Sequence, residues 1–156
     1  MPQGQYGPYP PGGEKHLRLD SGKALDIYRV KYWTFGSGDP PALQLEYEAL
    51  GSLQDVPALR QTARELWPAF APYVEALDLD HAIITATKLR RYGLIGFWWV
   101  RTNHFGLVVS RDSTGTWRFA DDRSPLPPAD YARGPQITEP SGSPLPVSRE
   151  RPKILP

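Results

Sequence analysis

The stretch DVPALRQTARELWPAFAPYVEAL, residues 55–77, decides the fold. Its apolar residues recur three or four positions apart, which predicts an amphipathic helix with one buried stripe. Asp55 is a favourable N-cap, and Pro57 falls in the first turn, where a missing N–H costs little. We expect this to be the only substantial helix of the chain. The stripe consists of Leu59, Ala63, Leu66, Trp67, Phe70, Val74 and Leu77.

Two further prolines lie inside this segment. Pro68 and Pro72 each remove an interior hydrogen bond, at a cost of about 3 kcal/mol in an unadapted helix. Because the apolar register continues through both, we expect one long helix with a kink near Trp67. The alternative is a helix that ends at Trp67 and is followed by a turn.

The segments on either side of the helix are rich in residues that favour strands. Residues 17–19 can pair with residues 24–35 through a turn at 20–23, where Asp and Gly favour a tight reversal. Residues 43–49 then alternate apolar and polar side chains, which predicts a strand with one solvent-exposed face. We expect its apolar face to meet the helix.

Three more strands are expected after the helix. Residues 81–87 are β-branched and apolar, which favours a central strand beneath the helix, and residues 93–96 should break it. Residues 97–111 are too long for one ordinary strand. We favour a bent strand with a bulge near Gly106 over a hairpin that turns at residues 102 and 103.

A short strand at residues 116–120 closes the predicted sheet. The fold class is therefore α+β: an antiparallel sheet of about five to six strands, with one long Pro-kinked helix on one face, in the order β-β-β-α-β-β-β.

The proline distribution sets the predicted limits of the domain. Residues 1–15 carry 4 of the 18 prolines and residues 123–156 carry 9. We expect a flexible Pro/Gly/Tyr-rich tether at 1–15, a compact domain at 16–122 and a disordered Pro-rich tail at 123–156.

Composition narrows the function. The chain has no cysteine, which excludes disulfides, thiolate zinc sites, iron–sulfur clusters and a thiol nucleophile. No motif predicts a cofactor, and no spacing predicts a catalytic site, so we expect a protein that is not an enzyme. No stretch approaches the roughly 20 apolar residues of a membrane-spanning helix. As written, the sequence predicts a soluble, cytoplasmic protein, or an exported or surface-tethered one if an N-terminal signal was removed.

One cluster has the chemistry of metal ligands. Asp78, Asp80 and His81 lie within four residues. A polar turn from helix to strand explains these residues better, because a metal site usually draws ligands from further apart. His16 and His104 are isolated in the sequence and have no identifiable catalytic partner. We therefore predict no metal site and no catalytic residue.

Residues 81–111 hold five basic residues and no acidic one. Aromatic residues are interleaved with them, as in proteins that stack bases on rings and follow phosphates with cations. The alternative is that acidic groups elsewhere balance this charge. Because Trp98 and Trp99 are adjacent, they should point to opposite faces of the sheet, and one helix can cover only one face. We expect one of these rings to be exposed for contact.

Three functions follow, in order of preference. The first is a non-enzymatic protein-interaction domain that binds a protein partner, or itself, through an exposed aromatic sheet face; its candidate residues are Trp98, Trp99, Phe97, Tyr92, Arg90, Arg91, Arg101 and His104. The second is a cone-like domain that binds a small apolar ligand in an aromatic pocket; its candidates are Tyr28, Tyr32, Trp67, Phe70 and Trp99. The third is binding of single-stranded nucleic acid by the basic and aromatic strip at residues 88–111.

Overall fold

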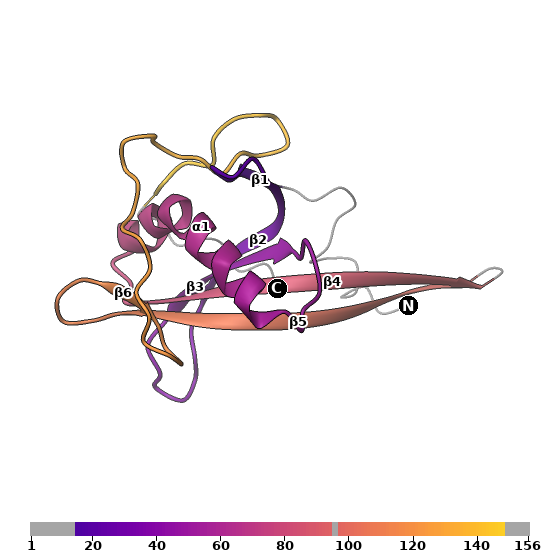
Figure 1. Cartoon of the computed structure of the whole chain (residues 1–156), viewed down its shortest axis with the longest axis horizontal. Coiled ribbons are helices and arrows are strands. Elements are labelled where there is room, and N and C mark those ends of the chain that lie inside the picture. The colour runs from indigo at the N-terminus through magenta and orange to yellow at the C-terminus, as the bar shows by residue number, and fades with distance from the viewer. Residues whose placement is uncertain (1–14, 95–96, 149–156) are drawn as a thin grey trace.

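The computed structural model describes residues 15–94 and 97–148; the side chains of residues 91, 92, 94 and 97–100 lie outside this description. Within the described residues, six strands form a single sheet, and one helix packs on one side of it (Figure 1). The predicted α+β class is confirmed. The elements are β1 (Lys15–Arg18), β2 (Ala24–Trp33), β3 (Ala42–Glu48), α1 (Val56–Ala76), β4 (His81–Leu94), β5 (Phe97–Arg111) and β6 (Trp117–Phe119).

The six strands follow one another across the sheet in sequence order. All neighbours are antiparallel except β3 and β4, which run parallel from the Leu43–Ala82 pair to the Glu48–Thr87 pair. The prediction of a wholly antiparallel sheet is therefore wrong at this pair. The physical reason is the connection: α1 carries the chain back along the sheet, so β4 starts at the same end as β3.

Helix α1 begins as predicted, because the Asp55 side chain accepts a hydrogen bond from the Ala58 N–H at 3.2 Å. It continues through Pro68 and Pro72 to Ala76, so the alternative of a helix that ends at Trp67 is wrong. The kink near Trp67 stays a prediction. Its buried stripe packs on β3 and β4 and forms the centre of the core. The largest fully buried side chains there are Trp67, Tyr47, Phe70, Phe119, Leu43, Leu45, Leu66 and Ile84.

The strand β5 is a single element. Its register with β4 is unbroken from the His81–Ser110 pair to the Leu94–Phe97 pair, so both the hairpin alternative and the bulge near Gly106 are wrong. The break expected at residues 93–96 also begins later than predicted, because β4 continues to Leu94. The register shift that the sheet does contain lies in β2, between Ile27 and Arg29.

Residues 123–148, the C-terminal segment, pack onto the domain. Leu126 and Ile137 of this segment are buried in the core. Thr138 exchanges two main-chain hydrogen bonds of 2.8 Å with His16 of β1. We expected a disordered tail from residue 123, and over its described length the segment is instead part of the folded unit.

The prolines of α1 help to explain this difference. Pro72 has no N–H, so the carbonyl of Pro68 lacks its helical partner. The N–H of Asp130 in the C-terminal segment donates to this carbonyl at 2.9 Å. One turn later, the Tyr73 hydroxyl donates to the Leu145 carbonyl at 2.6 Å. Burial raises the pKa of Tyr73 to about 12. The helix thus offers main-chain and side-chain anchors to a segment whose composition alone predicts disorder.

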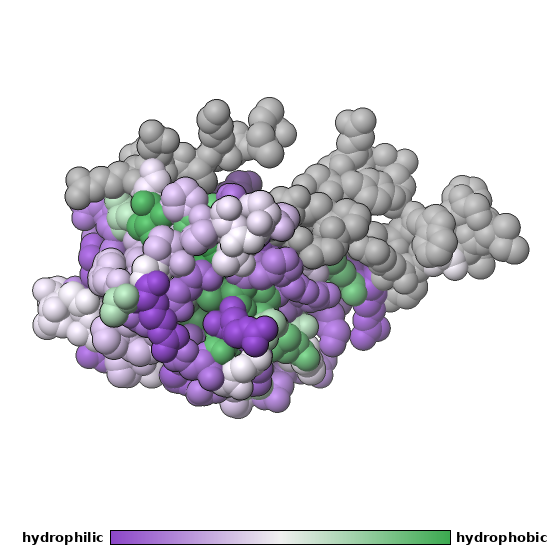
Figure 2. Space-filling view, turned by 90° about the horizontal axis from the view of Figure 1, so that it is seen from above, coloured by the Kyte–Doolittle hydropathy of each residue, from purple (hydrophilic) through white to green (hydrophobic). Residues whose placement is uncertain are grey.

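The surface on the side of β1 and the C-terminal segment is mostly hydrophilic, with small hydrophobic patches between the polar residues (Figure 2). Large apolar side chains that are exposed elsewhere lie apart in the sequence, as Leu50 and Val108 do. In the part of the chain that the structure describes, no helix is long and apolar enough to cross a bilayer.

Candidate interaction site on the β4–β5 arm

Strands β4 and β5 extend beyond the rest of the sheet. The pairing of β4 with β3 ends at Thr87, and from Lys88 to Leu94 the one strand that pairs with β4 in the described part of the chain is β5. We call residues 88–94 and 97–103 the β4–β5 arm. Figure 1 shows the arm reaching well past the helix and the other strands. Since an isolated pair of strands is at best marginally stable in water, the arm depends on the sheet that anchors its base.

Among the described residues, the outer edge of β5 has a strand neighbour at residues 109–111. The carbonyl of Val108 accepts from the Ala120 N–H at 2.9 Å, on the side away from β4, whereas the N–H of Arg111 points to Asp80 on the β4 side. Main-chain groups alternate along an antiparallel strand, so those of Thr102 and Gly106 point outward like those of Val108. Strand β6 pairs only with residues 109–111. Within the described ranges, no strand meets the outward groups of Thr102 and Gly106.

The arm carries positive charge that forms no ion pair with the acidic side chains among the described residues. Arg90 and Arg101 face each other across the two strands, and both are exposed. Neither makes an ion pair with another described residue. Lys88 at the base donates to the Gly51 carbonyl at 3.3 Å, which also leaves its charge unbalanced. Like charges facing each other destabilise a strand pair, so an acidic partner would relieve this repulsion.

A buried polar cluster holds the base of the arm. Glu46 of β3 is only 1% exposed, and its carboxylate accepts a hydrogen bond from Arg29 Nε of β2 at 2.7 Å. The Thr87 hydroxyl of β4 donates to the other carboxylate oxygen. On β5, His104 Nδ1 lies 2.9 Å from Thr87 Oγ1 and 3.3 Å from Glu46 Oε2. One carboxylate therefore joins four strands where the arm leaves the sheet.

A second polar row lies beside the first on the same face of the sheet. Gln44 donates to Thr85 Oγ1 at 2.9 Å and accepts from Trp33 Nε1 at 2.7 Å. The amine of Lys31 lies 3.8 Å from the centroid of the Trp33 ring, a cation–π contact. These bonds satisfy buried polar groups, which is what their burial requires. Both rows link neighbouring strands by side-chain hydrogen bonds at this end of the sheet.

The cluster does not present a nucleophile. Thr87 is fully buried, and its hydroxyl proton is directed at Glu46. With that proton engaged, His104 Nδ1 donates to the Thr87 oxygen instead of accepting from it. The chemistry of the cluster is structural: hydrogen bonds to a buried carboxylate position β5 relative to β3.

For five of the eight candidate binding residues, the structure describes the backbone but not the side chain: Tyr92, Phe97, Trp98, Trp99 and Arg91. Their backbone belongs to the arm, where Tyr92 pairs with Trp99 and Gly93 with Trp98. The structure brings Arg90 and Arg101 together along the arm and places His104 at its base. The exposure predicted for one of the Trp98 and Trp99 rings stays a prediction.

The aromatic pocket candidates are distributed differently. Trp67 and Phe70 are fully buried in the core, with ring centroids 5.8 Å apart and rings edge to face. Tyr32 belongs to the same core cluster, whereas Tyr28 does not. Burial and the nearby Glu48 carboxylate raise the pKa of Tyr28 well above its usual value. Three of the five candidates, Trp67, Phe70 and Tyr32, are thus core residues, and Tyr28 lies outside the core cluster. The side chain of Trp99 is not among those that the structure describes.

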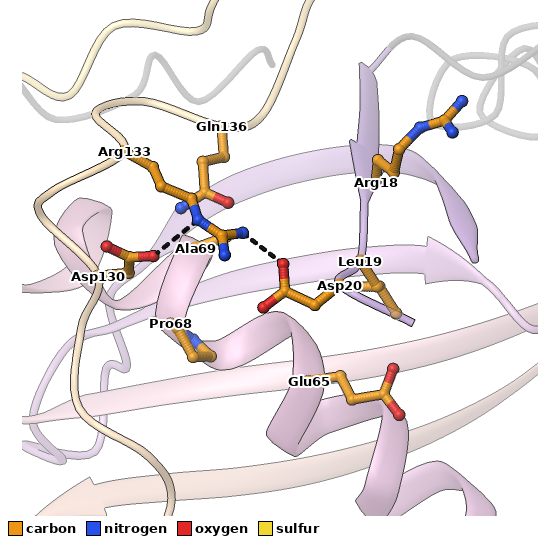
Figure 3. A pocket seen from close by; sticks show the side chains of 9 residues that line it. All are labelled: Arg18, Leu19, Asp20, Glu65, Pro68, Ala69, Asp130, Arg133 and Gln136. Atoms are coloured by element: carbon orange, nitrogen blue, oxygen red, sulfur yellow. Dashed lines mark hydrogen bonds and ion pairs between the residues drawn. The ribbon is translucent and has the colours of Figure 1, made fainter. Parts of the chain in front are cut away.

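A small pocket lies between β1, α1 and the C-terminal segment (Figure 3). Arg133 closes it through ion pairs with Asp20 and, at 3.3 Å, with Asp130. The hydrogen bond from Arg133 holds the pKa of Asp20 below its usual value. The volume of about 30 Å³ has room for only one or two water molecules. Its walls are Arg18, Leu19, Asp20, Glu65, Pro68, Ala69, Asp130, Arg133 and Gln136.

Two of the three residues with the chemistry of metal ligands, Asp80 and His81, have other side-chain partners. Arg111 Nη2 donates to the Asp80 carboxylate at 2.8 Å, and His81 Nδ1 lies 3.1 Å from Ser110 Oγ.

Sequence reasoning missed the polar cluster of Glu46 and Thr87. The available signal was a charged residue, Glu46, within a strand. The alternation of β3 placed Glu46 on the face predicted to be exposed, and the residues that bury it lie far away in the sequence.

No protein-family model, curated protein or solved structure matches the chain.

Proposed function

We propose that this protein is a non-enzymatic interaction domain that binds another protein through the β4–β5 arm. The observation that carries the proposal is the continuation of both strands beyond Thr87, where the sheet gives them no further neighbour among the described residues. A ribbon of this kind buries little surface against its own domain. Its aromatic and arginine content matches the composition of the buried centre of protein interfaces.

The base of the arm supports this function. The cluster of Glu46, Arg29, Thr87 and His104 joins β5 to the three strands before it. A recognition element that is already held in place loses less conformational freedom on binding, which leaves more of the interaction energy as affinity. The arm therefore combines an exposed surface with a rigid base.

Self-association is the less favourable form of this function. Two arms that paired with each other would bring Arg90 and Arg101 of both copies together, and like charges across strands are destabilising. Charged residues on an exposed edge are a common device against edge-to-edge association of identical chains. The charge of the arm favours a different, acidic partner.

An arm-shortened variant tests the proposal. Because Lys88 and Asn103 face each other, residues 89–102 can be replaced by Asn-Gly, which favours a two-residue hairpin turn and removes Arg90, Arg101 and the outward groups of Thr102. The full chain and the variant are each used to select binders from a displayed library of random 12-residue peptides. We expect the full chain to enrich a peptide family and the variant to enrich none of it, while thermal unfolding shows that both are folded.

Two results would overturn the proposal. Equal enrichment by both proteins would place binding away from the arm, and no enrichment by the full chain would remove the evidence for peptide recognition. A parallel titration with a fluorescent 15-nucleotide single-stranded DNA separates the third function. Binding of the DNA that depends on the arm and falls steeply with salt, without peptide binding, would replace protein by nucleic acid as the partner.

A further inference from the structure

We infer that the partner contributes an extended acidic segment, which adds as a strand to the outer edge of β5 at Arg101–Leu107. This inference rests on the proposed function and specifies the partner of the same site. Main-chain hydrogen bonds to an exposed edge supply affinity in this mode of recognition, and the side chains beside the edge supply specificity.

The edge is already built for a neighbouring strand. Strand β6 occupies this side of β5 at residues 109–111, and the last bond there joins Ala120 to Val108. A segment that pairs with Thr102 and Gly106 would continue the line of β6 along β5. The position beside β5 that β6 now fills only at residues 109–111 would then be filled along most of the strand.

The backbone at Gly106 can be approached closely. Glycine leaves the edge without a side chain, and even an added Cβ would lie 3.6 Å from its nearest neighbour, Thr85 Oγ1, an ordinary contact. Apolar contacts flank it on both faces of the sheet. Val108 is 46% exposed on the face opposite α1, and Phe105 is half-buried on the other. A bound strand could therefore place alternate apolar side chains on both.

The charge of the edge selects an acidic segment. Arg101 and its neighbour Arg90 lie at the arm end of the edge and have no ion pair among described residues. At the other end, Asp121 and Asp122 follow β6, and both pair with Arg60 of α1. We expect the acidic residues of the partner segment at the Arg101 end and apolar residues towards Leu107. A second copy of this chain would bring its own arginines to the same place.

A matched pair of substitutions tests the strand addition. Gly106→Pro removes the outward N–H of the edge and breaks no hydrogen bond to β4, because Gly106 and Thr85 form a non-hydrogen-bonded pair. Proline also fixes φ at this position, so thermal unfolding checks that the variant is folded. Gly106→Ala keeps that N–H and fits the available space. The probe is a fluorescein-labelled ten-residue peptide with three Glu at one end and alternating Val and Thr after them, titrated into the full-length protein.

We expect the Gly106→Ala variant to bind within about twofold of the unmodified protein and the Gly106→Pro variant at least about tenfold more weakly, as expected for one lost main-chain hydrogen bond with its desolvated partner. Amide exchange gives a second readout that needs no variant. The N–H groups of Thr102 and Gly106 should become protected when the peptide binds.

Substitutions of two cations, one at the edge and one away from it, test the role of the Arg101 charge. Arg101→Gln should weaken binding of the acidic peptide, and Lys23→Gln, an exposed cation in the turn after β1, should leave it unchanged. Replacing the three Glu of the peptide by Lys should abolish binding. Equal binding of the acidic and basic peptides would overturn the acidic character of the partner.

The outcomes separate the two proposals. If the arm-shortened protein loses all selected peptides but Gly106→Pro binds them as well as Gly106→Ala, strand addition is wrong and the interaction arm stands. If the arm-shortened protein still binds them, the proposed function itself is wrong. Concentration-dependent dimers that disappear with Gly106→Pro would show a second copy, instead of an acidic segment, on this edge.

Discussion

Replacing Ile137 by alanine tests whether the C-terminal segment belongs to the core. Ile137 is 0% exposed and packs in the same cluster as α1. The substitution removes three carbon atoms, worth about 0.8 kcal/mol each, and leaves a cavity that adds to this loss. The expected decrease in the free energy of unfolding is about 3 kcal/mol, a large part of the about 5–15 kcal/mol that stabilises a typical domain.

The assay is urea unfolding followed by tryptophan fluorescence, with thermal unfolding as a second measurement. A loss of about 3 kcal/mol should lower the melting temperature by about 10 °C for a protein of this size. Leu50→Ala is the control, because it removes the same number of carbon atoms from a side chain that is 55% exposed. Its expected effect is within about 0.5 kcal/mol. Equal effects of the two substitutions would show that the segment does not contribute to the core.

Three further predictions concern hydrogen bonds. Tyr73→Phe removes the donor to the Leu145 carbonyl and should cost about 1 kcal/mol in urea unfolding, with faster proteolysis of the C-terminal segment; unchanged proteolysis would contradict this anchor. Thr87→Val keeps the shape of the side chain but removes the hydroxyl shared with Glu46 and His104, so it should cost about 1–3 kcal/mol and speed amide exchange in the arm, whereas Thr87→Ser should retain much of the stability. Asp112 accepts bonds from Thr114 and Arg118, which hold its pKa well below the usual value, so its contribution to stability is present above about pH 4 and is lost as the pH falls through the lowered pKa. Asp112→Asn should therefore be less stable than the unmodified protein at pH 7, and the difference should shrink below pH 4; a gap that is independent of pH would refute the charge effect.

The helix and the nearer strands were predictable because their signals are local. The spacing of Leu59, Leu66 and Phe70 predicts the stripe that the structure buries. The alternation around Leu43 and Leu45 likewise identifies the face of β3 that meets α1. The parallel pairing of β3 with β4 was missed because residue composition says little about direction. The connection through a helix was the usable signal, since a crossover of this kind joins parallel strands.

The C-terminal segment was missed for a different reason. Its apolar residues, such as Leu126 and Ile137, have no periodicity, and proline-rich composition favours disorder on average. The main-chain bonds that hold the segment join it to residues far away in the sequence: Leu126 to Trp117, Asp130 to Pro68 and Thr138 to His16. In hindsight, a proline four residues after Pro68 marks a carbonyl without a partner, but the sequence does not say which segment supplies the donor.

The candidate site was predictable as a composition but not as a shape. The basic and aromatic strip at residues 88–111 was evident, whereas its projection as an arm was not. The arm begins where the pairing of β4 with β3 ends, at the Glu48–Thr87 pair, and the composition of the strip does not show where that is. Glu46 could not be predicted as buried, because the groups that satisfy its carboxylate come from β2, β4 and β5.

The docking of the C-terminal segment has a consequence for synthesis of the protein. Chains emerge from the ribosome N-terminus first, at about 5–20 residues per second. The helix and all six strands are therefore synthesised before Ile137 and Leu145. Until then, the surface of the nascent domain that Ile137 later covers stays open to solvent and to chaperones.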